Sequence, residues 1–435
     1  MPHGYNLREH QTVSNSGSVY PDSIAADLGI RIVVPRQNEG EFDFTLFGPV
    51  ITSPDRNLHG VSRRPPSEIF ALVDECRSVW KSAVVDFQRK VDVEGKAKFE
   101  FSFQEQWNFK NEANFHQNAA PRLAKAGENL FASIFEIKCD DGLREIGQAL
   151  RTLSLKDRYI AITSNSFFLP WGMLYTHPIE GATLKADGSN WEKKGFWGYR
   201  HIVQQTPEKY KLENGIQTNA AGEVTLSINF DDRLSGTMNL PSVDEHIQFL
   251  GQLGAKIKRT RKSELEIVFT ENRCNLERIL YFYCHGHGSS NAESSLSLKP
   301  PHLELTDDTV TALDFERWAK GERLPTSPLM FINACQGGQM TTLFYKSFAV
   351  ELLKEGAVGL IGAQIDVPAV FGAEYAKQMF SGFLARNKTG KVRLGPLLRR
   401  INRTMWDRHK NPLGLVYSLY RGVDCFIDWP KQLAG

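Results

Sequence analysis

The spacing of hydrophobic positions changes near residue 155 and divides the chain into two patterns. Between residues 66 and 87 apolar side chains recur every three or four positions, as on the buried face of an amphipathic helix. Segments 120–134 and 143–153 repeat this spacing. The pattern therefore predicts a mainly helical N-terminal module over residues 1–155, whose role it does not indicate.

Short apolar runs alternate with helical stretches after Asp157. The expected strands cover residues 159–163, 224–230, 265–269, 279–284, 329–332 and 357–363. Ser242 and Glu245 have the spacing of a capping box, which predicts a helix running through Leu250. Because strands and helices alternate, we expect an α/β fold with a mostly parallel central sheet.

Composition narrows the class of protein. The chain has 41% hydrophobic residues, and 52 Lys and Arg against 50 Asp and Glu give a net charge of +2. We therefore expect a soluble globular protein with no overall attraction to nucleic acid and no insertion into membranes. A short basic run is predicted to be a solvated loop between two elements. It consists of Lys256, Lys258, Arg259, Arg261 and Lys262.

Cysteine usage and the N-terminal residues indicate the compartment. The six cysteines are scattered without the close spacing of a disulfide framework, and the first ten residues lack the apolar core of a secretion signal. These features predict a reducing, cytoplasmic location. The strand-to-helix turns contain neither GxxxxGK[ST] nor GxGxxG, which argues against a nucleotide-binding protein. No cofactor is expected.

Two of the expected strands end in residues whose side chains are suited to catalysis. The strand at 279–284 continues into His285-Gly286-His287, and the strand at 329–332 continues into Asn333-Ala334-Cys335. Because the carboxyl ends of neighbouring parallel strands meet in one crevice, a His and a Cys are expected to lie close together there. An imidazole can take the thiol proton and return it to a leaving amine. The pattern predicts acyl transfer, with Cys335 as nucleophile and His285 as base.

Glycines beside these residues suit an oxyanion hole. Gly286 follows the His, and a Gln-Gly-Gly turn follows the Cys, so the amides of Gly286 and Cys335 are the candidate donors. Such donors contribute on the order of 3 kcal/mol to transition-state stabilisation. A zinc site at Cys284, His285 and His287 is the alternative. Strand alternation points adjacent side chains to opposite faces, and no CxxC or HExxH spacing accompanies them, so no metal is predicted.

The chain resembles the CHAT family of caspase-like proteases at these residues. The segment Asn333 to Gly337 is similar to the Q-A-C-x-G signature of caspases, whose His also lies about fifty residues upstream of the Cys. Four further segments are similar to CHAT sequences. They are Phe168 to Leu174, Phe196 to Arg200, Cys284 to Gly286 and Pro412 to Tyr417.

The resemblance implies a caspase-like three-layer sandwich over residues 156–435. Within it, an inactive first half at about 156–220 would pack against a catalytic half at about 221–435. The CHAT pattern ends its strand in Cys-His-Gly, which favours His285 as the base. On a register similar to that of separases, His287 would be the base instead, and mutating each His singly would decide between them.

Two residues are implied in substrate binding by the same resemblance. Asn333 corresponds to part of the floor of the S1 pocket in caspases. Asp366 corresponds to an acidic residue that selects basic P1 side chains in CHAT proteins and separases, although this chain has Gln364 where Trp is common. The resemblance therefore implies cleavage after Arg or Lys.

The family also implies a biological role. Bacterial CHAT proteases often act as effectors in defence or cell-death systems and cleave a protein partner such as a gasdermin. The polar stretch 181–222 could be a processing loop, with Lys193-Lys194 as a cut site. The other class of function that fits the fold is a catalytically inactive caspase-like adaptor, against which the presence of both His285 and Cys335 argues.

Overall fold

The structure is a computed structural model of residues 1–435. The structure describes residues 25–33, 41–51, 57–93, 96–100, 102–110, 113–177, 190–207, 215–234, 241–253, 255–271, 276–287, 300–335, 342–386 and 391–430. In this part of the chain, no helix combines the length and the apolar character that crossing a bilayer requires.

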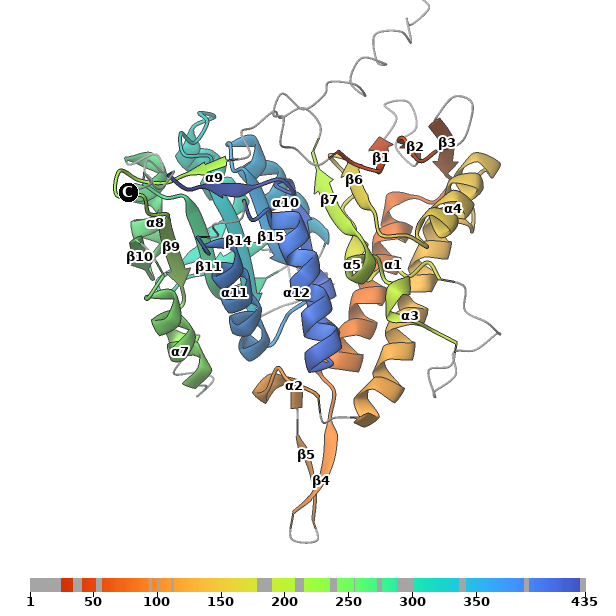
Figure 1. The fold of residues 1–435 in the computed structure, drawn as a ribbon, viewed down its shortest axis with the longest axis horizontal. Helices are drawn as coiled ribbons and strands as arrows, with labels where there is room; N and C mark the ends of the chain where they lie inside the picture. Colours follow the sequence, from red (N-terminus) through yellow and green to blue (C-terminus); the bar gives the residue numbers. More distant parts are fainter. Residues whose placement is uncertain are drawn as a thin grey trace, which may run out of the picture.

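One large mixed sheet forms the centre of the molecule (Figure 1). Its strands, in spatial order, are β10 (Ala255–Arg259), β9 (Thr225–Phe230), β11 (Ile279–His287), β14 (Leu329–Cys335), β15 (Gly359–Ala363), β16 (Tyr417–Tyr420), β7 (Ile202–Thr206), β6 (Tyr159–Thr163), β1 (Leu28–Val33), β2 (Phe42–Phe47) and β3 (Asn57–Ser62). Two short strands, β12 (His302–Glu304) and β13 (Thr309–Thr311), add to the end of β11. Most neighbours are parallel, and β16, β2 and β3 supply the antiparallel pairings of the main path.

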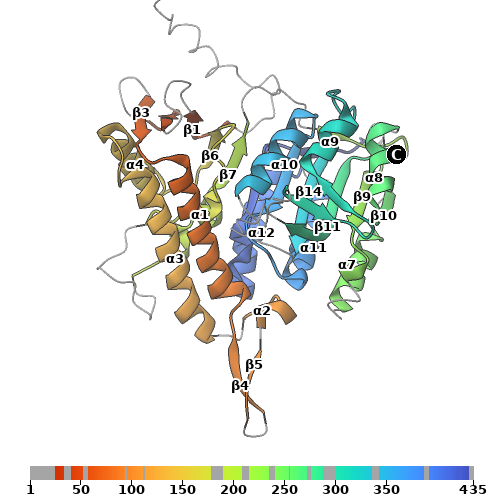
Figure 2. The same cartoon turned by 180° about the vertical axis from the view of Figure 1, so that it is seen from behind.

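Alternating side chains of the central strands enter two separate cores. In β11, Tyr281 and Tyr283 belong to the larger core, whereas Phe282 and Cys284 belong to the smaller one. On the larger-core face lie α7 (Pro241–Leu250), α11 (Ala369–Phe383) and α12 (Leu394–His409). On the other face lie α8 (Lys262–Thr270), α9 (Ala312–Ala319) and α10 (Thr342–Lys354). Figures 1 and 2 show these two helical layers from opposite sides. The expected three-layer α/β fold with a mostly parallel sheet is confirmed.

The first 155 residues contain the expected helices. These are α1 (Pro66–Trp80), continued by one π-helical turn (Lys81–Val85), α3 (Ala113–Phe135) and α4 (Asp141–Leu153). The same region also supplies β1, β2 and β3, and β1 pairs in parallel with β6. The short helix α2 (Ser102–Glu105) follows a hairpin of β4 (Arg89–Val93) and β5 (Lys96–Glu100), which projects from the body (Figure 1). A domain boundary at residue 155 stays a prediction, although the sheet continues across it.

One predicted strand and one predicted loop are wrong. Residues 265–269 lie in helix α8, where Leu265, Val268 and Phe269 are buried and Ile267 is exposed, so the period is helical and not two. The basic run expected to be a loop instead supplies the edge strand β10. Helix α7 begins at Pro241, one residue before the position expected to cap it.

Candidate active site

Two adjacent strands position the predicted His and Cys. β11 and β14 are parallel, and their register makes the Cα atoms of His285 and Cys335 direct partners. Neighbouring strands lie about 4.8 Å apart. Pleat alternation assigns positions 285 and 335 to the face that Tyr283 and Asn333 occupy, the face of helix α11. The structure describes Cys335 by its backbone and places His285 partly exposed beside it.

A buried polar network fixes β14 just before Cys335. The side chain of Asn333 is fully buried, and its Nδ2 donates to the Tyr281 hydroxyl at 2.9 Å and to the Gly372 carbonyl at 2.8 Å. Its Oδ1 accepts from the Tyr417 hydroxyl at 2.6 Å. Since the Tyr281 oxygen accepts from Asn333, its proton is available to Nε2 of His246 at 2.9 Å, whose pKa burial lowers to about 3. These bonds tie β14 to α11 and β16, and a direct contact of Asn333 with substrate stays a prediction.

Strand β11 extends past its expected end because β12 pairs with it. In this antiparallel pair, His285 has Glu304 as register partner, Gly286 has Leu303, and His287 has His302. Nε2 of His287 lies 3.0 Å from Oε1 of Glu304. Burial lowers the pKa of His287, and the Glu304 carboxylate opposes that shift. His285 thus lies between Cys335 on one side and β12 on the other, while the alternative base His287 has a carboxylate partner.

Asp366, the residue expected to select basic P1 side chains, forms an ion pair with a lysine of the N-terminal region. Asp366 follows β15, is 4% exposed, and its Oδ2 lies 3.5 Å from Nζ of Lys81 in the π-helical turn. Gln364, two positions earlier, accepts a hydrogen bond of 2.7 Å from Nη2 of Arg77 in α1. The end of β15 is therefore held by two basic residues of the segment 77–81, a contact that sequence patterns gave no means of finding.

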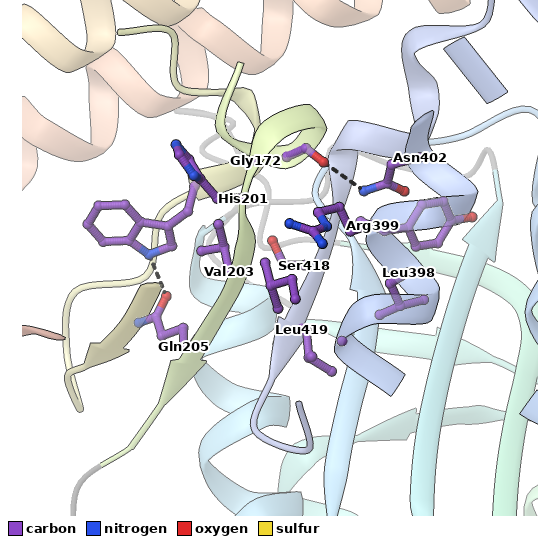
Figure 3. A pocket seen from close by; sticks show the side chains of 14 residues that line it. Gly172, His201, Val203, Gln205, Leu398, Arg399, Asn402, Ser418 and Leu419 are labelled. Carbon is purple, nitrogen blue, oxygen red and sulfur yellow. Dashed lines mark hydrogen bonds between the residues drawn. The ribbon is translucent and has the colours of Figure 1, made fainter. Parts of the chain in front are cut away.

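Three of the segments that resemble CHAT sequences lie around the pairing of β7 with β16. The 3₁₀ helices Trp171–Met173 and Pro412–Val416 and helix α5 (Trp197–Arg200) surround it. A cavity of about 40 Å³ lies there, lined by Trp171, His201, Gln205 and Asn402 among others (Figure 3). Trp171 Nε1 donates to Gln205 Oε1 at 3.0 Å. A space of this size fits a water molecule and not a peptide, so these motifs join the two parts of the sheet.

One of the two lysines of the expected cut site, Lys193, contributes to packing. Lys193 opens a 3₁₀ turn (Lys193–Gly195), its Nζ forms an ion pair with Asp407, and it lies 5.5 Å from the centre of the Tyr199 ring. Residues 181–189 and 208–214 of the same stretch lie outside the described residues. Processing at Lys193-Lys194 stays a prediction, and a cut there would require this contact to open.

Cysteine burial predicts which thiols react in the folded protein. Cys76, Cys139, Cys284 and Cys425 are buried thiols, and burial raises the pKa of Cys76 to about 12 and also raises that of Cys425. A thiol that stays protonated and inaccessible reacts slowly with alkylating agents. In native protein at neutral pH, iodoacetamide is therefore expected to modify none of these four quickly and to modify Cys335 first, as peptide mass spectrometry would show.

The control for this labelling is Cys274→Ser, which removes the one cysteine that lies outside the described residues and should leave the fast modification in place. Cys335→Ala should eliminate the fast modification. Rapid alkylation of Cys76 or Cys425 in protein that remains folded would contradict the buried placement of these thiols.

Comparison with known proteins supports a relationship to peptidases. Residues 252–420 match the model of peptidase family C25, a segment that is less than half of the chain and includes both His285 and Cys335. No curated protein sequence matches. Two crystal structures of the Saccharomyces cerevisiae separase–securin complex are similar, with TM-scores of 0.40 and 0.45 and sequence identities of 11% and 10%.

In both separase comparisons the alignment covers 92% of this chain and 30% of the other chain, so the chain spans about a third of the separase length. These structural likenesses are distant. The family match is the more informative finding because it covers β10, β11, β14, β15 and β16. Over residues 252–420, the chain is therefore related to the caspase-like cysteine proteases through its similarity to peptidase family C25.

Proposed function

We propose that this chain is a CHAT-type, caspase-like cysteine endopeptidase with Cys335 as nucleophile and His285 as base. The single observation that supports this most is the register of β11 and β14, in which these two positions are direct partners. The family match over the same strands agrees with it. No step of the proposed reaction requires a cofactor.

The reaction would proceed in two acyl transfers. His285 takes the proton of Cys335, and the thiolate attacks the scissile carbonyl to form a tetrahedral intermediate. The amides of Gly286 and Cys335 would stabilise its oxyanion. His285 then gives the proton to the leaving amine, which leaves a thioacyl enzyme. Water, deprotonated by His285, hydrolyses the thioester and restores the free thiol.

A positional scanning library of fluorogenic peptides tests the proposed activity on the purified full-length chain. Cleavage above the background of Cys335→Ala protein in at least one sublibrary is expected. Absence of any cleavage above that background, together with no labelling of Cys335 by peptide-based thiol probes, would favour the inactive adaptor. The same library reports the P1 preference.

A basic P1 preference is proposed on the basis of Asp366, which is buried next to the end of β15. Truncating one partner of a buried charge pair costs about 2–5 kcal/mol. Asp366→Asn is therefore expected to lower kcat/KM for Arg-P1 peptides relative to Leu-P1 peptides on the order of 100-fold. Lys81→Ala should raise kcat/KM for Arg-P1 peptides, because the substrate would no longer compete with Lys81 for the carboxylate.

The control for these variants is Lys125→Ala, which removes an exposed lysine from another ion pair, that with the partly buried Glu128. It should leave the ratio of the two kcat/KM values unchanged. An unchanged Arg-to-Leu ratio in Asp366→Asn protein, measured on protein that melts like wild type, would refute the assignment of Asp366 to substrate selection.

The proposed biological role is that of a cytoplasmic effector protease in bacterial defence or cell death, which cleaves a protein partner such as a gasdermin. Residues 1–155 would then sense a signal, inhibit the protease or dock the substrate. Coexpression with candidate partners tests this role, and cleavage should depend on Cys335. If no coexpressed partner is cut selectively while peptides are, the effector role fails and the peptidase proposal remains.

A further inference from the structure

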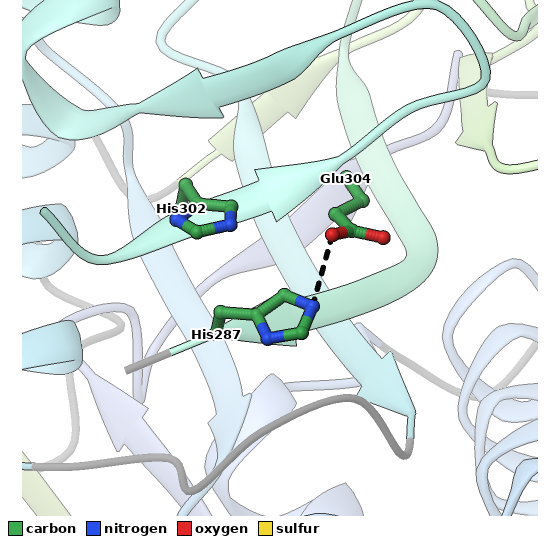
Figure 4. A group of neighbouring side chains, drawn as sticks. All are labelled: His287, His302 and Glu304. Atoms are coloured by element: carbon green, nitrogen blue, oxygen red, sulfur yellow. Dashed lines mark ion pairs between the residues drawn. The ribbon is translucent and has the colours of Figure 1, made fainter. Parts of the chain in front are cut away.

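Strands β11 and β12 bring a second group of reactive side chains together beside the proposed dyad. His287 ends β11, and His302 and Glu304 come from β12 (Figure 4). In the register, His287 and His302 are direct partners. Leu303, which lies between His302 and Glu304, is buried in the smaller core, so its two neighbours share the opposite face.

Hydrogen bonding sets the state of the His302 ring. Its Nδ1 lies 2.8 Å from the carbonyl oxygen of Pro300. A carbonyl can only accept a hydrogen bond, so Nδ1 carries a proton, and in the neutral form of the ring the lone pair is then on Nε2. Histidine ligands of metal ions are commonly oriented in this way, with the second ring nitrogen donating to a backbone carbonyl. His302 is 8% exposed, and the ring nitrogen bonded to the backbone is Nδ1.

The ligand atoms of the three residues already lie near the distances found in a metal site. The rings of His287 and His302 are stacked with centres 5.0 Å apart, and Nε2 of His287 is 3.0 Å from Oε1 of Glu304. One ligand atom from each of the three residues lies within 4.8 Å of the other two. Bonds of about 2.0–2.2 Å in a tetrahedral zinc site place ligand atoms about 3.4 Å apart, which small side-chain rotations would achieve here.

Arg233 forms an ion pair with one oxygen of the Glu304 carboxylate and leaves the other oxygen available. Nη2 of Arg233 lies 3.8 Å from Oε2 of Glu304 and 2.7 Å from Oδ2 of Asp231. The arginine is therefore mainly paired with Asp231, and Oε1 of Glu304 faces the two rings. Two imidazoles and one carboxylate form a donor set that suits Zn²⁺ and similar divalent transition-metal ions.

We propose that His287, His302 and Glu304 form a binding site for a divalent transition-metal ion, Zn²⁺ above all, with a fourth coordination position open to solvent or a substrate atom. No ligand spacing in the sequence points to it, because His302 and Glu304 come from a different strand than His287. His285 and His287 share a face of β11, so the ion would lie next to the proposed dyad. We expect the ion to inhibit the peptidase, a consequence that rests on the proposed function.

Binding is tested on full-length Cys335→Ala protein, so that the result does not depend on peptidase activity or on the Cys335 thiol. Co²⁺ is added to metal-free protein and its visible absorption bands are recorded, followed by competition with Zn²⁺. One Co²⁺ per chain with the intense bands of a four-coordinate ion is expected, displaced by one Zn²⁺. Glu304→Gln, which keeps the side-chain volume, and His302→Ala should each weaken binding at least tenfold.

His59→Ala is the matched control, because this exposed histidine bonds to Thr45 in another part of the sheet. It should bind Co²⁺ like the parent. Absence of stoichiometric binding at micromolar metal, or equal affinity in the His59 and Glu304 variants, would overturn the proposal and leave a simple ion pair between His287 and Glu304. Binding that occurs in wild type but not in Cys335→Ala protein would also overturn it, since the ion would then require the thiol.

Discussion

Cys335→Ala is expected to abolish peptide hydrolysis, and His285→Gln to lower kcat by about 10³- to 10⁴-fold while His287→Gln lowers it less than tenfold. Loss of a nucleophile removes the covalent route altogether, and loss of the general base removes a contribution of about 10²- to 10⁴-fold plus activation of the thiol. The difference between the two histidines follows from the register, because His285 and not His287 is the partner of Cys335. Steady-state kcat and the burst of acyl enzyme, both measured with EDTA present, provide the test.

His59→Gln serves as the histidine control, since His59 lies in β3 at the far end of the sheet from β11. Far-UV circular dichroism and melting temperature establish that each variant folds. If His287→Gln is the inactive variant and His285→Gln keeps its activity, the base is His287 oriented by Glu304, and the assignment of His285 is wrong. Hydrolysis that persists in Cys335→Ala protein would remove the covalent mechanism itself.

The central strands were predictable because each is a short apolar run that both layers of helices cover. Residues 159–163 form β6 with the expected bounds, and the expected strands at 279–284 and 329–332 form the first parts of β11 and β14. The ends were less predictable. β11 continues to His287 because β12, only three residues long, pairs with it, and no local pattern marks a strand of that length.

The pairing of His285 with Cys335 in one register position follows from a general rule about parallel strand ends, so the sequence alone led to it. The neighbours of these residues come from elsewhere in the chain. Glu304 reaches His287 through an antiparallel turn back, and Lys81 reaches Asp366 from the N-terminal region. Such contacts depend on tertiary packing, for which a single sequence has no periodic signal.

The segment 255–270 shows how local charge can mislead. A run of lysines and arginines is usually a solvated loop, but in β10 Lys256 and Lys258 are exposed while Ile257 and Arg259 are partly buried, which is the alternation of an edge strand. Charged side chains on an edge also discourage pairing with other chains. Leu265, Val268 and Phe269 then bury one face of α8, and five residues are too few to separate this period from that of a strand.

Arg259→Ala is expected to lower the free energy of unfolding by about 3–5 kcal/mol, the cost of breaking a buried ion pair by removing one partner. Nη2 of Arg259 donates to Oε1 of Glu277 at 2.6 Å, and Nη1 donates to Oγ of Ser227 at 2.6 Å. The side chains of Arg259 and Glu277 are 10% and 1% exposed. Without the arginine, the Glu277 carboxylate would be buried and would lose the cation that bonds to it. Urea unfolding followed by tryptophan fluorescence measures the loss.

Lys258→Ala, one position earlier on the exposed face of β10, is the matched control and should change stability by less than about 0.5 kcal/mol. The double variant Arg259→Ala with Glu277→Gln should recover part of the loss, because a neutral amide is less costly to bury than an unpaired carboxylate. The alternative result is that the losses of stability from Arg259→Ala and Glu277→Gln add in the double variant, and that Lys258→Ala costs as much as Arg259→Ala. Arg259 would then stabilise the edge strand only through the length of its side chain and not through the ion pair with Glu277. An inward-facing cation would then have no part in fixing this edge of the sheet.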